Sequence, residues 1–284
     1  MGETTRTNEA RSGRQIYVEI LVRSSMDSLW ELSQDPALHP RWDLRFSRIV
    51  PTGVGSDRHS QFRYEFQLPF CAITGIGTSL GHKTTAGGQA TSVLKFSTSN
   101  PLSPIGPGSG YWRYVPVDQG IRFITGYNYA PGMGALGRKL DARFIRPGLG
   151  WATALSFDRL RLWAESGVDP ARSRNAWFLD AAARAAGVAG AAGLLRHAVA
   201  ARPLNASLKN PGSLKNLPAR ASTAALGLTL AGLALTLPSH PTVPKAKRCL
   251  RQPPDRGSAE APASLKTLPD PDHRKQPQFE GAPA

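Results

Sequence analysis

Aromatic side chains are concentrated in the first part of this chain. Of its 22 Phe, Trp and Tyr residues, 19 lie before position 168, whereas the last 117 residues hold three aromatics and 26 alanines. Because aromatic side chains contribute much of the area that a folded core buries, only the first part can build a large core. A chain of 284 residues therefore has room for one well-packed domain followed by a long appendage.

The chain is strongly basic along its whole length. It has 35 Lys and Arg against 20 Asp and Glu, and its formal charge of +15 divides into +6 for residues 1–167 and +9 for residues 168–284. Such an excess attracts anionic lipid or nucleic acid without specificity. The basic residues form no stripe, and no helix-turn-helix or zinc-finger pattern occurs. We therefore expect no specific nucleic-acid partner, and a non-specific nucleic-acid or membrane-surface binder remains only a third hypothesis.

Cysteine and histidine usage argues against several kinds of site. The two cysteines, Cys71 and Cys249, are too few for a disulfide-rich fold or a cysteine-based metal or iron–sulfur centre. The six histidines never occur three or four residues apart, so no helical metal site is expected. Residues 1–14 have no apolar stretch typical of a secretory signal. These observations predict a cytoplasmic protein without a bound metal.

The pattern of residues 14–167 predicts an α+β domain. Residues 15–22 alternate as a half-buried strand does, and residues 26–33 have the apolar spacing of a short helix. Further strands are expected at 62–68, 72–80, 91–97, 111–117 and 121–129, with residues 98–110 as a loop. Helical spacing then covers 135–165, where Pro147 and Gly148 must kink or split the helix. That last helix is the only element large enough to cover one face of an antiparallel sheet.

Two short motifs suggest other functions, but their context does not fit. Residues 132–137 match the G-x-G-x-x-G pattern of dinucleotide-binding proteins, with Asp158 about 20 residues further on. No βαβ unit surrounds them, so a glycine-rich turn from strand to helix is the better interpretation. Residues 77–81 match the G-x-S-x-G of α/β-hydrolases, but no helix follows Ser79. We interpret Ser79 as a strand hydroxyl.

The order of elements in this part of the chain resembles a known family, the polyketide cyclase/dehydrase and lipid-transfer members of the START-like (SRPBCC) superfamily. The resemblance covers about residues 14–167. It rests on the opening strand with Met26-Asp-Ser-Leu-Trp30 and His39-Pro-Arg-Trp42-Asp43, on Gly120-Ile-Arg-Phe123 with Tyr127-Asn-Tyr129, and on Gly134-Ala-Leu-Gly137-Arg-Lys-Leu-Asp141, Phe144-Ile-Arg-Pro147 and Trp151 through Trp163.

This resemblance implies a helix-grip fold, in which a curved antiparallel sheet wraps a long C-terminal helix and encloses an apolar cavity. The residues implied to line the cavity are Tyr64, Phe66, Tyr127, Tyr129 and Trp151, with His39, Trp42 and Asp43 as a polar part or entrance. The implied function is binding of a hydrophobic, lipid- or polyketide-like molecule. The alternative is an aromatic cyclase or dehydratase that works without a cofactor. The residues show no catalytic signature, so an enzyme is the less favoured interpretation.

The remaining residues divide by composition. Residues 1–13 are expected to be disordered, 168–237 to form an Ala-rich helical region, and 238–284 to be a Pro-rich, basic, disordered tail. The uncharged part of the first Ala-rich stretch, 185–195, is too short to cross a bilayer. The uncharged run 221–237 is the candidate membrane segment, and its basic flanks predict contact with anionic lipid.

Overall fold

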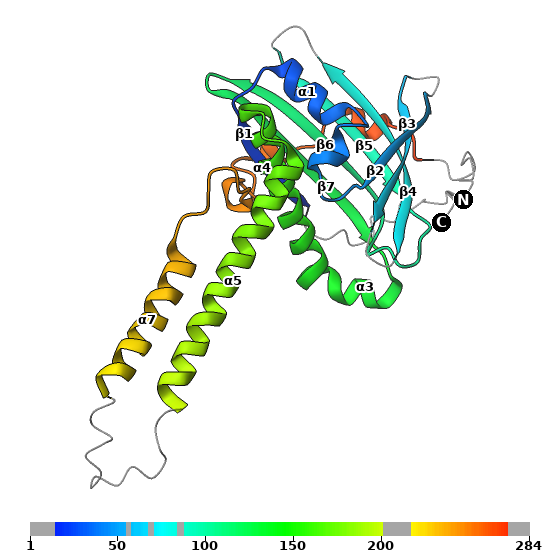
Figure 1. The fold of residues 1–284 in the computed structure, drawn as a ribbon. Helices are drawn as coiled ribbons and strands as arrows, with labels where there is room; N and C mark the ends of the chain where they lie inside the picture. Colours follow the sequence, from blue (N-terminus) through cyan, green and yellow to red (C-terminus); the bar gives the residue numbers. More distant parts are fainter. Residues whose placement is uncertain (1–14, 55–57, 68–70, 84–87, 201–216, 272–284) are drawn as a thin grey trace, which may run out of the picture. The chain divides into compact units, whose positions relative to one another are not determined.

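The structure is a computed structural model that describes residues 15–54, 58–67, 71–83, 88–200 and 217–271. The N-terminal segment 1–13, expected to be disordered, lies outside the described residues. The core of the fold is a seven-stranded antiparallel sheet with the order β1-β7-β6-β5-β4-β3-β2 (Figure 1). The strands are β1 Ile16–Val22, β2 Arg48–Val54, β3 Ser60–Gln67, β4 Ala72–Lys83, β5 Ala90–Ser97, β6 Ile105–Val117 and β7 Gly120–Pro131.

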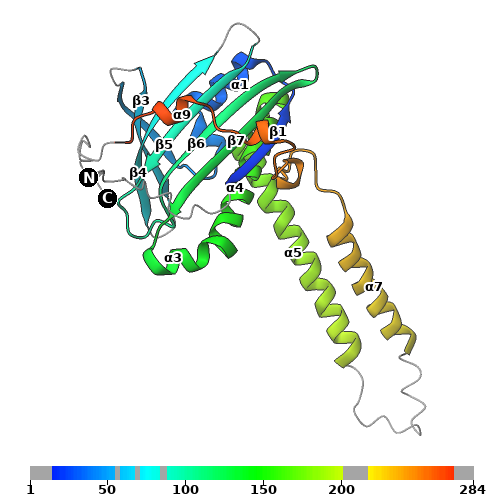
Figure 2. The ribbon, with the colours of Figure 1, turned by 180° about the vertical axis from the view of Figure 1, so that it is seen from behind.

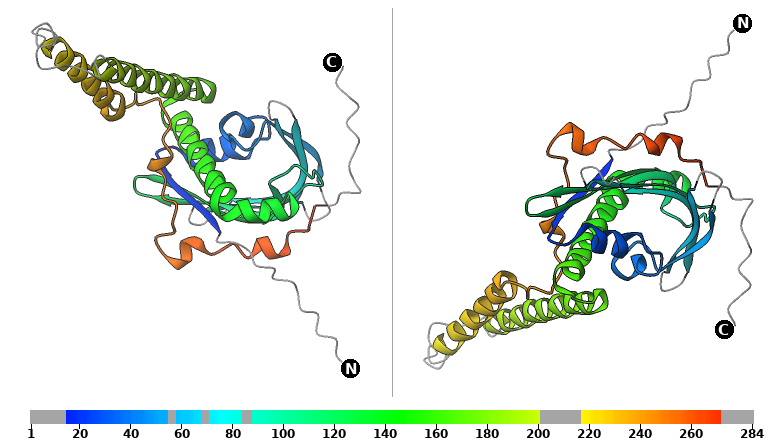
Figure 3. Two further views of the ribbon diagram at one scale, coloured as in Figure 1. Left: turned by 90° about the horizontal axis from the view of Figure 1, so that it is seen from below. Right: turned by 90° about the horizontal axis from the view of Figure 1, so that it is seen from above.

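Helices connect and follow these strands. They are α1 Met26–Gln34, α2 His39–Trp42, α3 Gly134–Leu140, the π-helix Asp141–Ile145, α4 Arg146–Ser166, α5 Pro170–Ala200, α7 Leu217–Thr236, the 3-10 helix Ala246–Arg248, α8 Arg256–Ala259 and α9 Ser264–Thr267. The sheet curves around α4, and α1 and α2 lie on the same inner side (Figure 3). The predicted α+β helix-grip architecture is therefore confirmed.

The main core lies between α4 and the concave face of the sheet. Phe157 of α4 stacks on Phe123 of β7 with ring centroids 4.5 Å apart, and both side chains are fully buried. Trp42 closes the core from α2, and its indole Nε1 donates to Leu32 O at 2.9 Å. Stacked and tilted aromatic rings at these distances add stability beyond their buried area.

Strand β6 differs from the sequence prediction. It begins at Ile105, so residues 105–110, the second part of the segment 98–110 that was expected to be a loop, are strand. The sequence shows no alternation of apolar and polar residues there, because glycines occupy several of the strand positions. A Cβ built on Gly108 would lie 2.4 Å from Cζ of Phe96, which occupies the space that a side chain would take. Gly126 of β7 also marks a close approach, because a Cβ built on it would lie 2.5 Å from the Tyr111 hydroxyl.

The glycine-rich turn at 132–137 has a packing explanation. A Cβ on Gly137 would lie 1.9 Å from Gly132 O, and one on Gly132 would lie 2.1 Å from Ser103 O. The turn leads from β7 into α3, and the sheet around it is antiparallel throughout. Neither a parallel strand pair nor a nucleophile elbow occurs among the described residues, since Ser79 lies within β4.

The segment after residue 244 departs most from the prediction. Instead of a disordered tail, residues 245–271 run along the convex face of the sheet (Figure 2). Leu268 is 3% exposed and packs in a cluster with Tyr17, Val93, Tyr111 and Ile124. The physical reason is that this outer face carries an apolar cluster between its charged residues, so a proline-rich chain with a few well-placed leucines buries apolar area by covering it.

The described chain forms two compact units. One consists of residues 1–171 together with 245–284, and the other of residues 172–244. The second unit is therefore an insertion in the first. This differs from the predicted boundaries at 167 and 237, because the end of the chain returns to the sheet.

Candidate functional site

The concave face of the sheet gathers most of the residues predicted for a cavity. Side chains alternate between the two faces along a strand, and directly paired residues of antiparallel strands share a face. Phe123 faces α4, so Tyr127 and Tyr129 of β7 lie on the concave face with it. Gly77 pairs with both Phe62 and Phe96, and Phe96 pairs with Gly108, which pairs with Tyr129. Tyr64 and Phe66 of β3 therefore lie on this face too.

One cross-strand row on this face alternates aromatic side chains and glycines. It consists of Phe62, Gly77, Phe96, Gly108 and Tyr129. The ring of Phe62 lies over Gly77, where a Cβ would be 2.4 Å from its Cζ. Phe62, Phe66 and Phe96 are only half-buried, whereas Tyr64, Tyr127 and Tyr129 are buried. The row therefore presents apolar rings that the protein's own side chains do not fully cover.

Charged residues avoid this face. Among the described strand residues, the charges lie on the convex side, with the exception of Lys83 at the end of β4. Lys83 is paired with Asp27 of α1. The convex charges are Glu19, Arg48, Arg63, Glu65, Lys95, Arg113 and Arg122.

Trp151 does not join this group as expected. It remains 42% exposed on α4, whereas Phe157 and Leu160 on the same helix are fully buried. The sequence predicted a kink or split at Pro147 and Gly148, and the structure divides the segment slightly earlier, where the π-helix Asp141–Ile145 precedes α4. Phe144, within the π-helix, is 61% exposed.

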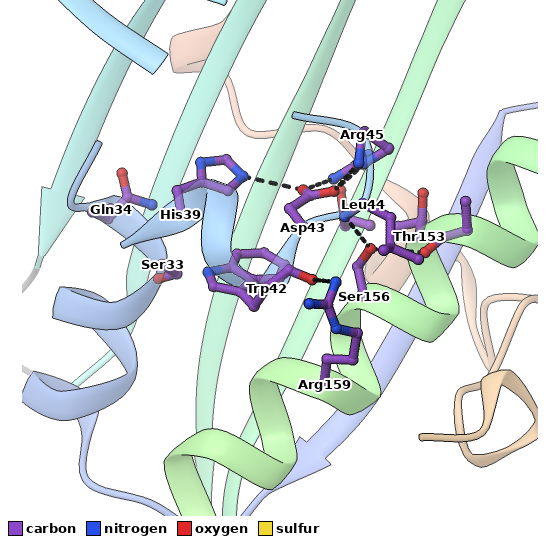
Figure 4. Close-up of polar contacts among 12 residues, drawn as sticks. Ser33, Gln34, His39, Trp42, Asp43, Leu44, Arg45, Thr153, Ser156 and Arg159 are labelled. Atoms are coloured by element: carbon purple, nitrogen blue, oxygen red, sulfur yellow. Dashed lines mark hydrogen bonds and ion pairs between the residues drawn. The ribbon is translucent and has the colours of Figure 1, made fainter. Parts of the chain in front are cut away.

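A buried polar cluster lies beside the aromatic face, where α2 meets α4 (Figure 4). The Asp43 carboxylate accepts from Nε and Nη2 of Arg45 at 2.9 and 2.6 Å, and its Oδ2 lies 3.1 Å from Nε2 of His39. The Asp43 side chain is fully buried, and those of His39 and Arg45 are 12% and 17% exposed. His39, Trp42 and Asp43 therefore lie together, and Arg45 is the member that sequence reasoning missed.

The environment fixes the protonation states of this cluster. Burial lowers the pKa of His39 from its usual value, and the hydrogen bond with Asp43 only partly offsets this effect. Burial alone would raise the pKa of Asp43, but the Arg45 guanidinium and His39 hold it far below its usual range. At neutral pH the cluster therefore contains a neutral imidazole and an Asp43–Arg45 ion pair, and its net charge is zero.

Aromatic rings and hydroxyls hold the cluster against the sheet. The His39 ring stacks on Trp42 at 4.9 Å and meets Trp112 edge-on at 4.9 Å. The Arg45 guanidinium lies 5.3 Å from the centre of the Tyr127 ring. The Tyr127 hydroxyl is 2.9 Å from Oγ1 of Thr153 on α4, and burial raises the pKa of Tyr127. These contacts connect α2, β7 and α4 at one place.

A second buried cluster holds the π-helix to the sheet. The Tyr129 hydroxyl donates to Oδ1 of Asp141 at 2.6 Å, and Nε of Arg146 donates to Oδ2 of the same carboxylate at 3.0 Å. Nη1 of Arg146 donates to Oδ1 of Asn128 at 2.8 Å. Burial and the bond to Asp141 raise the pKa of Tyr129, so its hydroxyl remains a donor. This cluster is neutral as well, and the uncharged aromatic row begins beside it.

The described residues include no group of three or more His, Cys, Asp or Glu placed to hold a metal ion. The chemistry available on the concave face is therefore apolar contact along the row, with hydrogen bonding from hydroxyl and ion-pair groups at its ends.

Comparisons with known proteins give one curated relative and many solved structures. No family model matches the chain. The chain is 43% identical over 161 residues to the uncharacterized membrane protein YndG of Bacillus subtilis (strain 168), an alignment that covers 56% of this chain. This chain spans 60% of the length of that relative.

The solved structures that match include proteins named as aromatase/cyclases, as a STAR-related lipid transfer protein and as a START superfamily protein. The Zhui aromatase/cyclase from Streptomyces sp. R1128 is 12% identical with a TM-score of 0.40, and the match covers 55% of this chain and 98% of that one. The STAR-related lipid transfer protein from Xanthomonas axonopodis is 15% identical with a TM-score of 0.41, covering 52% and 84%. A START superfamily protein from Mycobacterium smegmatis is 14% identical with a TM-score of 0.36, covering 51% and 95%.

Proposed function

We propose that this protein binds a hydrophobic, lipid- or polyketide-like small molecule between the concave face of its sheet and the α3–α4 segment. The observation that carries the proposal is the half-buried, uncharged row of rings and glycines that includes Phe62, Gly77 and Phe96. Both neighbouring polar clusters are neutral, so an uncharged apolar ligand meets no unpaired charge there. Tyr127 and Tyr129 are the hydroxyls that orient its polar end.

Binding of an apolar fluorescent probe to the purified full-length protein tests this proposal. We expect a dissociation constant in the low micromolar range, about −8 kcal/mol. Phe96→Ala removes a ring from the row and should weaken binding about tenfold. The control is Val93→Ala on the convex face of the same strand, which should lower stability but leave the affinity of the folded protein unchanged. Equal affinity of the wild type and a folded Phe96→Ala variant would contradict the placement.

A cyclase or dehydratase remains a second candidate because of one observation, the His39–Asp43 pair. If His39 donates Nε2–H to Asp43, its Nδ1 is left as an acceptor on a neutral imidazole, which is the form that a general base needs. The test is turnover of a poly-β-ketone substrate by the wild type and by His39→Gln. Turnover that His39→Gln abolishes while probe binding persists would favour the enzyme. Absence of turnover in both would favour binding alone.

We also propose that the protein is associated with a membrane through residues 221–237, with the sheet unit facing the cytoplasm. Leucines of α7 support this, since Leu226, Leu228 and Leu235 are 59%, 63% and 71% exposed. The curated relative YndG, which is named a membrane protein, supports it too. The basic flanks of α7 suit anionic lipid. Retention in membranes after a carbonate wash is the expected result, and release by the wash would contradict the proposal.

A further inference from the structure

Helices α5 and α7 run antiparallel, side by side (Figures 1 and 2), and they approach each other at small residues. A Cβ added to Gly187 of α5 would lie 2.9 Å from Cβ of Ala234 in α7, and one added to Gly227 would lie 3.1 Å from Cγ of Leu195. Ala191, between these levels, is 2% exposed. Close approach through glycine and alanine is how helices associate where no hydrophobic effect drives them together, as in lipid.

The outward surface of the pair is apolar. Besides the three α7 leucines already named, five more large apolar side chains are exposed on the two helices: Phe178 58%, Leu179 71%, Val188 42%, Val199 64% and Leu233 47%. Helix α5 is also the one helix among the described residues that is long and apolar enough to cross a membrane. It extends well beyond the uncharged stretch 185–195, which the sequence suggested was too short. In water this surface would be an unusually large exposed apolar patch.

Polar groups mark the two edges of this apolar layer. At one edge Arg184 of α5 pairs with Asp180 and donates to Ala234 O and Leu237 O, which satisfies the carbonyl end of α7. Trp177 lies about one helical turn before Asp180, toward the N-terminus of α5. Aromatic residues are common at this level, where a helix meets a membrane surface. At the other edge lies Arg220 of α7.

Between these edges the layer is about 25 Å thick. The uncharged run 221–237 has 17 residues, and at about 1.5 Å rise per residue this gives about 25 Å, close to the hydrocarbon core of a bilayer of about 30 Å. On α5, Arg196 and His197 are exposed within the last two turns before Ala200. Side chains this near the edge reach the lipid head groups by extending along the helix.

The sheet unit holds both ends of the insertion at consecutive residues of α4. Nη2 of Arg159 donates to Pro170 O at 3.0 Å, and Oδ2 of Asp158 accepts from Lys245 N at 2.7 Å. The chain therefore leaves the sheet unit and returns to it at neighbouring points. A single membrane crossing would put residues 170 and 245 on opposite sides of the bilayer, which these contacts exclude. Only an even number of crossings satisfies them.

Resting on the proposed membrane association, we propose that α5 and α7 cross the bilayer together as a helical hairpin. Both ends of the hairpin, and the whole sheet unit, lie on one side, and the end of α5 at Ala200 lies on the other. A hydrophobic ligand of the sheet unit is thereby kept next to a lipid surface.

Cysteine labelling in intact membranes tests the hairpin with the full-length chain. In a Cys71→Ser/Cys249→Ala background, single cysteines replace Asn175 and His240 near the sheet unit and Ala200 at the opposite end, three positions that are exposed. A membrane-impermeant maleimide is applied to right-side-out and to inverted vesicles. We expect Asn175→Cys and His240→Cys to react in the same vesicle preparation, and Ala200→Cys only in the other.

Three other outcomes would overturn the hairpin. Labelling of Ala200→Cys in the same preparation as the other two would mean that the pair is embedded in one leaflet without crossing the bilayer. Labelling of Asn175→Cys and His240→Cys in different preparations would mean a single crossing. In both cases the protein would still resist the carbonate wash, so membrane association itself would stand. Release of the protein by the wash would overturn both proposals.

Discussion

At the residue scale, His39 makes stability depend on pH. Its pKa in the folded protein is lowered by burial, despite the neighbouring Asp43 carboxylate, whereas the unfolded chain has a histidine pKa of about 6.5. As the pH falls below about 6.5, the unfolded state takes up a proton that the folded state does not. The stability that the neutral imidazole contributes is therefore complete above this pH, and it is lost by up to about 1.4 kcal/mol per pH unit below it.

Urea unfolding at pH 7.5, 6.5 and 5.5 measures this effect. We expect the wild type to lose its stability advantage over His39→Gln as the pH falls through this range. His240→Gln, which changes an exposed histidine, should follow the wild type at each pH. A difference between the wild type and His39→Gln that stays constant from pH 7.5 to 5.5 would contradict a lowered pKa.

The Asp141–Arg146 pair should respond strongly when it is broken on one side only. Arg146→Met leaves the Asp141 carboxylate buried without its cation, and the free energy of unfolding should fall by about 3–5 kcal/mol. Adding Asp141→Asn removes the unpaired charge and keeps a partner for the Tyr129 hydroxyl, so the double variant should regain part of the loss. Chemical denaturation measures both, with the exposed Arg143→Met as the control. A double variant less stable than Arg146→Met would show that the charge is not the cause.

At the element scale, the segment 245–271 should stabilise the sheet although its composition suggests disorder. Leu268 is 3% exposed in the convex cluster, so Leu268→Ala should lower the free energy of unfolding by about 2–4 kcal/mol. Leu250→Ala, at a leucine of the same segment that is 54% exposed, should change it by less than about 0.5 kcal/mol. Equal, small effects of the two changes in thermal or urea unfolding would restore the original prediction of a disordered tail.

The sequence predicted the elements whose side chains alternate clearly. The strands bearing Tyr64 and Tyr127 were expected with the correct inward face, because aromatic and polar residues alternate along them. Strand β2 was missed, since Pro51 and Gly53 interrupt its pattern at a register shift. The tail was missed because its leucines have no period of their own. Their positions follow the sheet that they cover, and this is a tertiary property.

The polar part of the site was likewise predictable from the sequence only in part. The family resemblance implied His39, Trp42 and Asp43 as a polar part or entrance, and the short helix α2 with its C-cap places them together. Arg45 completes the cluster only because the chain turns back after α2, and Asp141 meets Arg146 only through a π-helical turn. Helical periodicity in a sequence assumes 3.6 residues per turn, so a π-helical turn of this kind has no sequence signal here.

At the scale of the whole molecule, the fold of the first unit depends on both ends of the chain. Strand β1 pairs with Leu250 at Glu19, and Arg113 of β6 donates to Gly257 O at 2.8 Å. Thr78 of β4 donates to Pro269 O at 2.7 Å. The first unit is therefore closed by contacts between residues more than 100 positions apart, with the helical unit inserted between them.

These contacts predict that cleavage of the chain within the insertion does not make the two fragments dissociate. A specific protease site introduced between Ala200 and Leu217 would give two fragments, of which the second carries Leu268 and the rest of the segment on the convex face. We expect the fragments to co-elute in detergent under native conditions, because Leu268 and the backbone bonds hold the second fragment to the sheet.

The α5–α7 contacts could hold the fragments together too, so Leu268→Asp separates the two causes. In the cut protein this variant should weaken the association, since it places a charge in the apolar cluster, whereas Leu250→Asp should not. Fragments that stay together equally in both variants would show that the helices hold the molecule closed, and that the segment 245–271 does not.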